Sequence, residues 1–127
     1  MPTYQVIDIL TRIGLALAAQ HGLVAPVLRE VDTLTISQIS AAVQDLLDRA
    51  ARNALCPADL EGGCMTITNL GKFGIDSFIP IVIPGQASIL GVGCIREQCV
   101  PDGRQIQIRK KMTLTLSVDH RIVNGAE

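Results

Sequence analysis

A single stretch of helical periodicity, at residues 35–53, stands among apolar segments that otherwise follow strand patterns. Thr35 and Gln38 have the spacing of a capping box, in which each side chain accepts a hydrogen bond from the other residue's backbone N–H. Apolar residues then recur at steps of three and four along one face: Ile36, Ile39, Val43, Leu46, Leu47 and Ala50. One helix cannot cover a broad sheet, so one sheet face is expected to lack a partner within this chain.

Strand patterns account for most of the remaining chain. In residues 112–119 apolar and polar side chains alternate, with Met112 and Leu114 on one side and Thr113 and Thr115 on the other. Other strands are expected over 13–19, 23–29, 64–69, 78–83, 87–95, 95–100 and 105–109, with a turn at 57–60 and another at 101–103. The sequence therefore predicts an α/β fold of the two-layer α+β type with one main helix.

Composition narrows the classes of protein and partner. A length of 127 residues suits one domain, and 48% apolar residues with only 2% aromatic ones imply a core of aliphatic side chains. A formal net charge of −1 without a basic stripe argues against nucleic acid as a partner. No apolar run approaches the ~20 residues of a membrane span, and residues 1–8 lack the pattern of a signal peptide. Neither nucleic acid nor a membrane is therefore an expected partner.

The four cysteines show no C-x-x-C spacing: Cys56, Cys64, Cys94 and Cys99. Zinc would need four ligands, and neither histidine is spaced with a cysteine pair. We expect reduced, mostly buried thiols and no bound metal.

His120 stands between an acid, Asp119, and a base, Arg121, where the last strand gives way to an Asn-Gly turn. Its unperturbed pKa of ~6.5 would let it exchange a proton near neutrality. Because it continues the apolar parity of the strand, we expect it in a buried or half-buried cleft. A purely structural histidine is the alternative. The other histidine, His21, is most simply a solvated loop residue.

The run 117–125, SVDHRIVNG, resembles the signature of the dihydrolipoyl acyltransferases of 2-oxo acid dehydrogenase complexes. Four earlier blocks resemble the catalytic domain of that family in the same order: GLVAPV at 22–27, LTISQIS at 34–40, GGCMTITNLGKFGI at 62–75 and PIVIPGQASILGVG at 80–93. The resemblance implies a chloramphenicol-acetyltransferase-like mixed sheet. The family domain is about twice as long, so residues 1–127 are expected to form a single, partial catalytic domain without lipoyl or peripheral-subunit-binding domains.

The resemblance also implies roles for particular residues. His120 would be the base for a thiol that is only a few per cent ionised at pH 7. Thr68, where family members carry Ser or Thr, would donate a hydrogen bond to the oxyanion; the alternative is an ordinary β-branched strand residue. Asn124 stands where most members have Asp, and its alternative role is to form a turn with Gly125. Ile83 departs from the family, which usually places Asn before the proline.

Other residues of these blocks would support the site. Asp119 and Arg121 are expected to hold the turn by ion pairing rather than to touch substrate. Asn69 and Gly125 are further supporting candidates from the two blocks.

The implied reaction is the transfer of an acyl group between a dihydrolipoyl thiol and coenzyme A, without a metal, and the motifs favour acetyl. In the family, histidine and hydroxyl come from neighbouring subunits of a trimer. The implied partners are a homotrimer or larger core, lipoyl domains, and the decarboxylase and dihydrolipoyl dehydrogenase components, in the cytoplasm or, in a eukaryote, the mitochondrial matrix. The alternative is a non-catalytic core or assembly module that keeps the fold without the chemistry.

Overall fold

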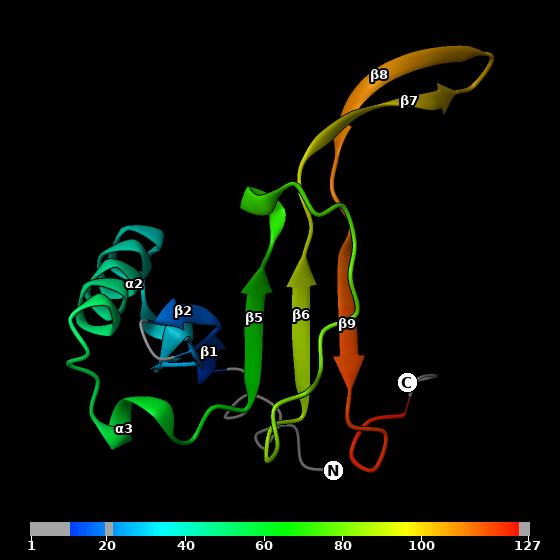
Figure 1. The fold of residues 1–127 in the computed structure, drawn as a ribbon. Coiled ribbons are helices and arrows are strands. Elements are labelled where there is room, and N and C mark those ends of the chain that lie inside the picture. Colours follow the sequence, from blue (N-terminus) through cyan, green and yellow to red (C-terminus); the bar gives the residue numbers. More distant parts are fainter. Residues whose placement is uncertain (1–10, 20–21, 125–127) are drawn as a thin grey trace.

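The structure, a computed structural model, describes residues 11–19 and 22–124. Its centre is a five-stranded mixed sheet with the order β4-β1-β5-β6-β9 (Figure 1). The strands are β1 Ile13–Leu15, β4 Val27–Leu28, β5 Met65–Asn69, β6 Ser88–Val92 and β9 Leu114–Val118. β1, β5 and β6 run parallel, whereas β4 and β9 lie at the edges and run antiparallel to their neighbours. The mixed sheet and the single main helix confirm the predicted fold class.

The main helix, α2, spans Ile36–Ala51, and its predicted capping box is confirmed. The Thr35 backbone N–H donates to Gln38 Oε1 at 2.8 Å, and the Gln38 N–H donates to Thr35 Oγ1 at 3.3 Å. Leu46 and Ala50 are buried, but Ile36 is 87% exposed and therefore lies outside the packed stripe. α2 contacts the short strand β2, Leu17–Ala19, and so lies at one side of the sheet (Figure 1).

Short elements replace several longer predicted ones. Each of the two expected N-terminal strands is broken in two, giving β1 with β2 and then β3, Gly22–Val24, with β4. β2 and β3 pair separately as a two-stranded sheet. The expected turn at 57–60 is a short helix, α3, Pro57–Leu60, and 3-10 helices form at Val31–Thr33 (η1) and Gly71–Phe73 (η2). His21 lies outside the described residues.

The strand predicted at 78–83 is wrong, because this segment makes no sheet pairing. It carries Pro80, whose backbone nitrogen has no hydrogen to donate to a neighbouring strand. The segment covers the sheet instead. Pro80 is buried, and a Cβ on Gly91 would lie 3.0 Å from the ring of Phe78. Because Gly91 has no side chain, the segment 78–83 can pack closely against β6 at this position.

The two faces of the sheet differ in cover. The register places Thr66 of β5 beside Ile89 of β6 and Ile89 beside Ser117 of β9, and this face is covered. The opposite face includes Leu90 and Leu116, and Leu116 is 56% exposed. The alternation predicted for the last strand is thus confirmed, and one sheet face does lack cover among the described residues. The covered face of β9, however, is the polar one.

A two-stranded hairpin, β7 Arg96–Asp102 and β8 Gln105–Lys111, projects from one end of the sheet (Figure 1). Its strands and its turn were both predicted, and the strands are longer than expected. Gly103 adopts the positive φ of 62° at the turn between them. We call residues 96–111 the arm.

All four cysteines are free, as expected, but they are not mostly buried: Cys56 and Cys99 are exposed, and Cys64 and Cys94 are half-buried. Among the described residues, no cluster of His, Cys, Asp or Glu side chains could hold a metal ion. No helix in this part of the chain is both long enough and apolar enough to cross a membrane.

Candidate active site

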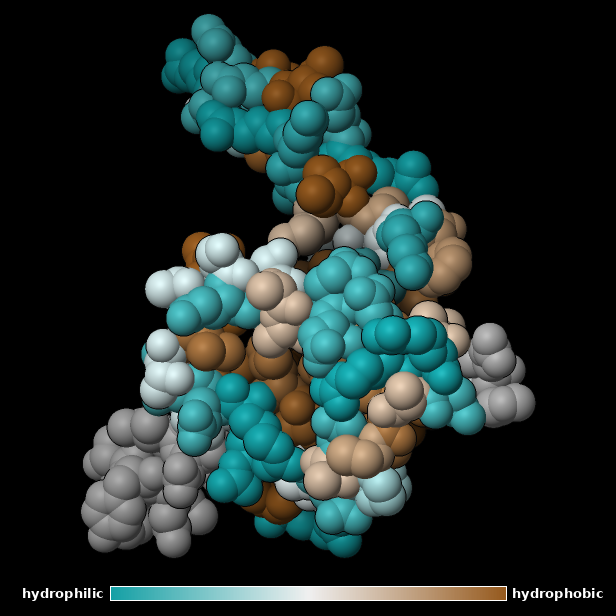
Figure 2. Space-filling view, turned by 90° about the vertical axis from the view of Figure 1, so that its left-hand side faces the viewer, coloured by the Kyte–Doolittle hydropathy of each residue, from teal (hydrophilic) through white to brown (hydrophobic). Residues whose placement is uncertain are grey.

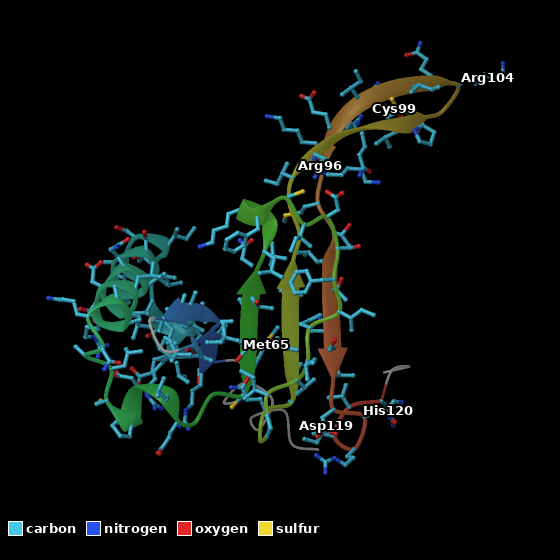
Figure 3. All side chains as sticks on the ribbon, viewed as in Figure 1. Met65, Arg96, Cys99, Arg104, Asp119 and His120 are labelled. Carbon is cyan, nitrogen blue, oxygen red and sulfur yellow. The ribbon has the colours of Figure 1, made fainter. Side chains whose placement is uncertain are left out.

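His120 lies immediately beyond β9, at the end of the molecule opposite the arm (Figure 3). The Asp119 N–H donates to the Ala87 carbonyl at 2.9 Å, and the N–H groups of Ile122 and Val123 both donate to the Asp119 carbonyl. The chain therefore leaves the sheet in a tight turn. His120 is exposed rather than buried, since the strand ends at Val118 and its alternation no longer applies.

An open depression of about 380 Å³ lies beside His120. Its other wall is formed by residues 82–86. Gln86 in that wall is only 8% exposed, and its Oε1 accepts a hydrogen bond of 2.6 Å from the fully buried Thr66 hydroxyl. Sequence reasoning did not find this pair, since no local spacing relates two residues 20 positions apart.

Asp119 and Arg121 form the expected ion pair, with Nη2 and Oδ2 separated by 2.7 Å. Asp119 Oδ1 also accepts from the Arg121 backbone N–H at 3.0 Å. The Arg121 side chain first, and its backbone N–H second, lower the pKa of Asp119 to about 2. The carboxylate therefore stays ionised at neutral pH and fixes the turn that carries His120.

Thr68 lies near the end of β5, half-buried, in the wall of an apolar cavity of about 230 Å³. Phe78, Pro80 and Ile89 line the same cavity. Among the described residues the Thr68 hydroxyl has no hydrogen-bond partner, so it is free to donate to a bound molecule. The adjacent Asn69 closes the turn after β5, because its Oδ1 accepts from the Gly71 N–H at 2.9 Å.

The structure does not bring Thr68 and His120 together within one copy. Thr68 is level with Gly91 of β6 and, across that strand, with Thr115 of β9. From Thr115 to Val118 the strand runs for about 10 Å, and β5 and β9 lie about 10 Å apart across β6. His120 lies beyond Val118, so its imidazole and the Thr68 hydroxyl cannot reach one reacting carbonyl from the same chain.

Asn124 is exposed and makes no hydrogen bond with the residues that the structure describes. It lies four positions after His120, at the end of the described segment. Gly125 lies outside the described residues.

Known proteins resemble this chain along nearly its full length. The family model for 2-oxoacid dehydrogenases acyltransferase (catalytic domain) matches residues 6–127. The dihydrolipoyllysine-residue acetyltransferase component of the pyruvate dehydrogenase complex of Rickettsia bellii is 40% identical over 114 residues, which are 90% of this chain and 27% of the relative. The mitochondrial acetyltransferase component of Schizosaccharomyces pombe is 41% identical over 90% of this chain and 24% of the relative. The chain thus spans about a quarter of the length of these curated relatives.

A solved structure of the dihydrolipoamide acetyltransferase of Azotobacter vinelandii superposes with a TM-score of 0.88 and 38% identity, covering 91% of this chain and 48% of that one. That structure concerns the roles of a serine, a histidine and an asparagine in catalysis, and the serine precedes the histidine by 52 positions and the asparagine follows it by 4. With the family model matching nearly the whole sequence, the chain belongs to the 2-oxoacid dehydrogenase acyltransferase family, within its catalytic domain.

Proposed function

We propose that this chain supplies the catalytic groups for transfer of an acyl group, acetyl by preference, between a dihydrolipoyl thiol and coenzyme A. One observation carries the proposal. Thr68, His120 and Asn124 have the same separations, 52 and 4 positions, as the serine, histidine and asparagine studied in the Azotobacter enzyme. Several relatives are named acetyltransferase components, which favours an enzyme over an assembly module without chemistry.

In the proposed reaction His120 removes the proton from the attacking thiol. The thiolate adds to the thioester carbonyl carbon, and the Thr68 hydroxyl donates a hydrogen bond to the oxyanion. The tetrahedral intermediate then expels the other sulfur, which takes its proton from the imidazolium. Such base catalysis typically contributes ~10²–10⁴-fold, and an oxyanion donor ~10²–10³-fold. Asn124 lies close enough in sequence to His120 to help to orient it.

The wide separation of Thr68 and His120 in one copy supports a site shared between two copies. We therefore propose a homotrimer or larger core, and one structural relative is the cubic core of a pyruvate dehydrogenase complex. Coenzyme A and a lipoyl group are the proposed substrates. Lipoyl domains and the decarboxylase and dihydrolipoyl dehydrogenase components are the proposed partners, in the bacterial cytoplasm or the mitochondrial matrix.

The test mixes two defective variants of the full chain. His120→Ala and Thr68→Ala should each lower acetyl-coenzyme A–dependent acetylation of dihydrolipoamide by at least about 10²-fold. When the two are unfolded and refolded together, random pairing gives about one quarter of the shared sites an intact histidine and an intact threonine. About a quarter of the wild-type rate should therefore return.

The control replaces the Thr68→Ala chain with a His120→Ala/Thr68→Ala double variant, because that mixture contains no intact histidine and should recover nothing. Full activity of the His120→Ala chain alone would refute the chemistry. Inactive single variants that recover nothing on mixing would refute the shared site.

A further inference from the structure

We propose that Ile83 determines which acyl groups this chain transfers, by lining an apolar cavity beside Thr68 that accepts neutral acyl chains and excludes charged ones. The inference rests on the proposed function, because it takes the acyl carbonyl to lie against the Thr68 hydroxyl. The remainder of an acyl group bound in this way would extend into the cavity that Thr68 lines.

The cavity beside Thr68 has an apolar wall apart from that hydroxyl. Its other lining residues are aliphatic, aromatic or proline side chains, from positions 16 and 23, the segment 78–83 and β6. On the side of the molecule that carries α2, Figure 2 shows hydrophobic side chains at the bottom of a hollow between more hydrophilic ones. A carboxylate in such a cavity would lose hydration without gaining a cation, which is far less favourable than binding a hydrocarbon chain.

The cavity is larger than an acetyl group requires. Its volume is about 230 Å³. An apolar cavity of about 150 Å³ already binds a benzene molecule. Neutral acyl groups of roughly three to five carbons, such as propionyl, should therefore fit as well as acetyl does.

A tight turn fixes the position of Ile83. The Gln86 N–H donates to the Ile83 carbonyl at 3.0 Å, with Pro84 and Gly85 between them. Gly85 has the positive φ of 86° that the third residue of a type II turn requires. Gln86 is itself held by the hydrogen bond of 2.6 Å from the buried Thr66 hydroxyl. Ile83 therefore belongs to a preformed wall.

Ile83 also lies between the cavity and the depression beside His120. It is half-buried and lines both of them. Arg121 lines the depression and carries a positive charge that would suit a carboxylate. The aliphatic side chain of Ile83 separates this charge from the cavity. An asparagine at this position could instead donate a hydrogen bond to a carboxylate.

A second cavity beside Thr68 offers the acyl chain another direction. It has a volume of about 170 Å³, and Lys72 is the charged side chain in its wall. A carboxylated acyl group would favour this cavity. The Lys72 ammonium, however, already lies over the ring of Phe73, 5.0 Å from its centre. The cavity lined by Ile83 is larger and uncharged, so we assign the acyl chain to it.

Equilibrium binding to the unmodified chain tests the cavity without catalysis. S-Propionyl-dihydrolipoamide and S-succinyl-dihydrolipoamide differ only in a terminal carboxylate. In calorimetric titrations the propionyl compound should bind at least about tenfold more tightly, because the carboxylate finds no cation in the cavity. The same preference is expected in His120→Ala, since His120 does not line this cavity.

These titrations separate the two proposals. A binding preference without any acyl transfer would refute the proposed function alone. Transfer of acetyl groups by a chain that binds the propionyl and succinyl compounds equally would refute the role of the cavity alone.

A matched pair of variants tests Ile83 itself. Ile79→Asn makes the same change in the same segment, but Ile79 is 84% exposed and does not line the cavity. Ile83→Asn should lower the ratio of kcat/KM for propionyl-coenzyme A to that for succinyl-coenzyme A at least about tenfold, and Ile79→Asn should leave it within about twofold.

The ratio is informative even if a variant folds poorly, because partial unfolding lowers both rates equally. An unchanged ratio in Ile83→Asn overturns the proposal. So does a selective loss of succinyl transfer in Lys72→Met, since the acyl chain would then lie in the second cavity.

Discussion

Thr66 and Thr68 lie two positions apart on β5, yet their hydroxyls have different surroundings. Thr66 is fully buried and donates to Gln86, whereas Thr68 lines a cavity without a partner among the described residues. A buried hydrogen bond stabilises a fold, whereas a hydroxyl without a partner can donate a hydrogen bond to a bound molecule. The strand pattern alone does not distinguish the two residues, and only the resemblance singled out Thr68.

We therefore expect a Thr→Val change to lower stability at position 66 and to lower activity at position 68. Thr66→Val leaves the buried Gln86 oxygen without its donor and should lower the free energy of unfolding by about 1–3 kcal/mol. Thr68→Val should change stability by less than about 0.5 kcal/mol but lower the acyl-transfer rate. Urea titration and the dihydrolipoamide assay measure the two quantities. Equal loss of stability in both variants would contradict the assignment.

Asp119 gives the turn at His120 a specific pH dependence. Its pKa is about 2 in the folded chain against an ordinary 3.8, so its contribution to stability is present above pH 3.8 and is lost as the pH falls through about 2. Asp119→Asn should therefore unfold at lower urea than wild type at pH 6, and the gap should narrow towards pH 2. Asp32→Asn, at an exposed position without an ion pair among the described residues, should track wild type throughout. A gap that stays constant with pH would count against this role.

Among the elements, those with local signals were predicted correctly. The Thr35 capping box and its apolar stripe predicted α2, and the Pro-Asp-Gly turn predicted the arm. The prediction of a strand at 78–83 was wrong because the apolar residues of this segment cover the sheet rather than pair with one of its strands. Alternation in β9 correctly predicted which residues share a face. It could not tell which face is covered, because that depends on segments distant in sequence.

Truncating one aliphatic side chain on each face of the sheet tests which face is covered. Ile89 is 5% exposed and Leu116 is 56% exposed, on opposite faces. Ile89→Ala should cost about 2–5 kcal/mol of unfolding free energy, as buried aliphatic truncations do. Leu116→Ala should cost less than about 1 kcal/mol in the dissociated chain. Similar losses at both positions would mean that the Leu116 face is covered as well.

At the scale of the whole molecule, the resemblance named the candidate residues and implied that the histidine and the hydroxyl come from different subunits, but local sequence patterns did not indicate where the two lie on the sheet. The family blocks named Thr68, His120 and Asn124, and nothing local indicated that Thr68 and His120 lie far apart across the sheet. That distance follows from strand order, which places β6 between β5 and β9.

The distance between the Thr68 hydroxyl and the His120 imidazole would also decide when a newly made chain could begin the proposed transfer. If each copy holds two incomplete half-sites, a newly synthesised monomer contains no complete site and cannot consume acetyl-coenzyme A. Turnover would then begin only once enough copies have accumulated to meet, and protein abundance itself would set the threshold.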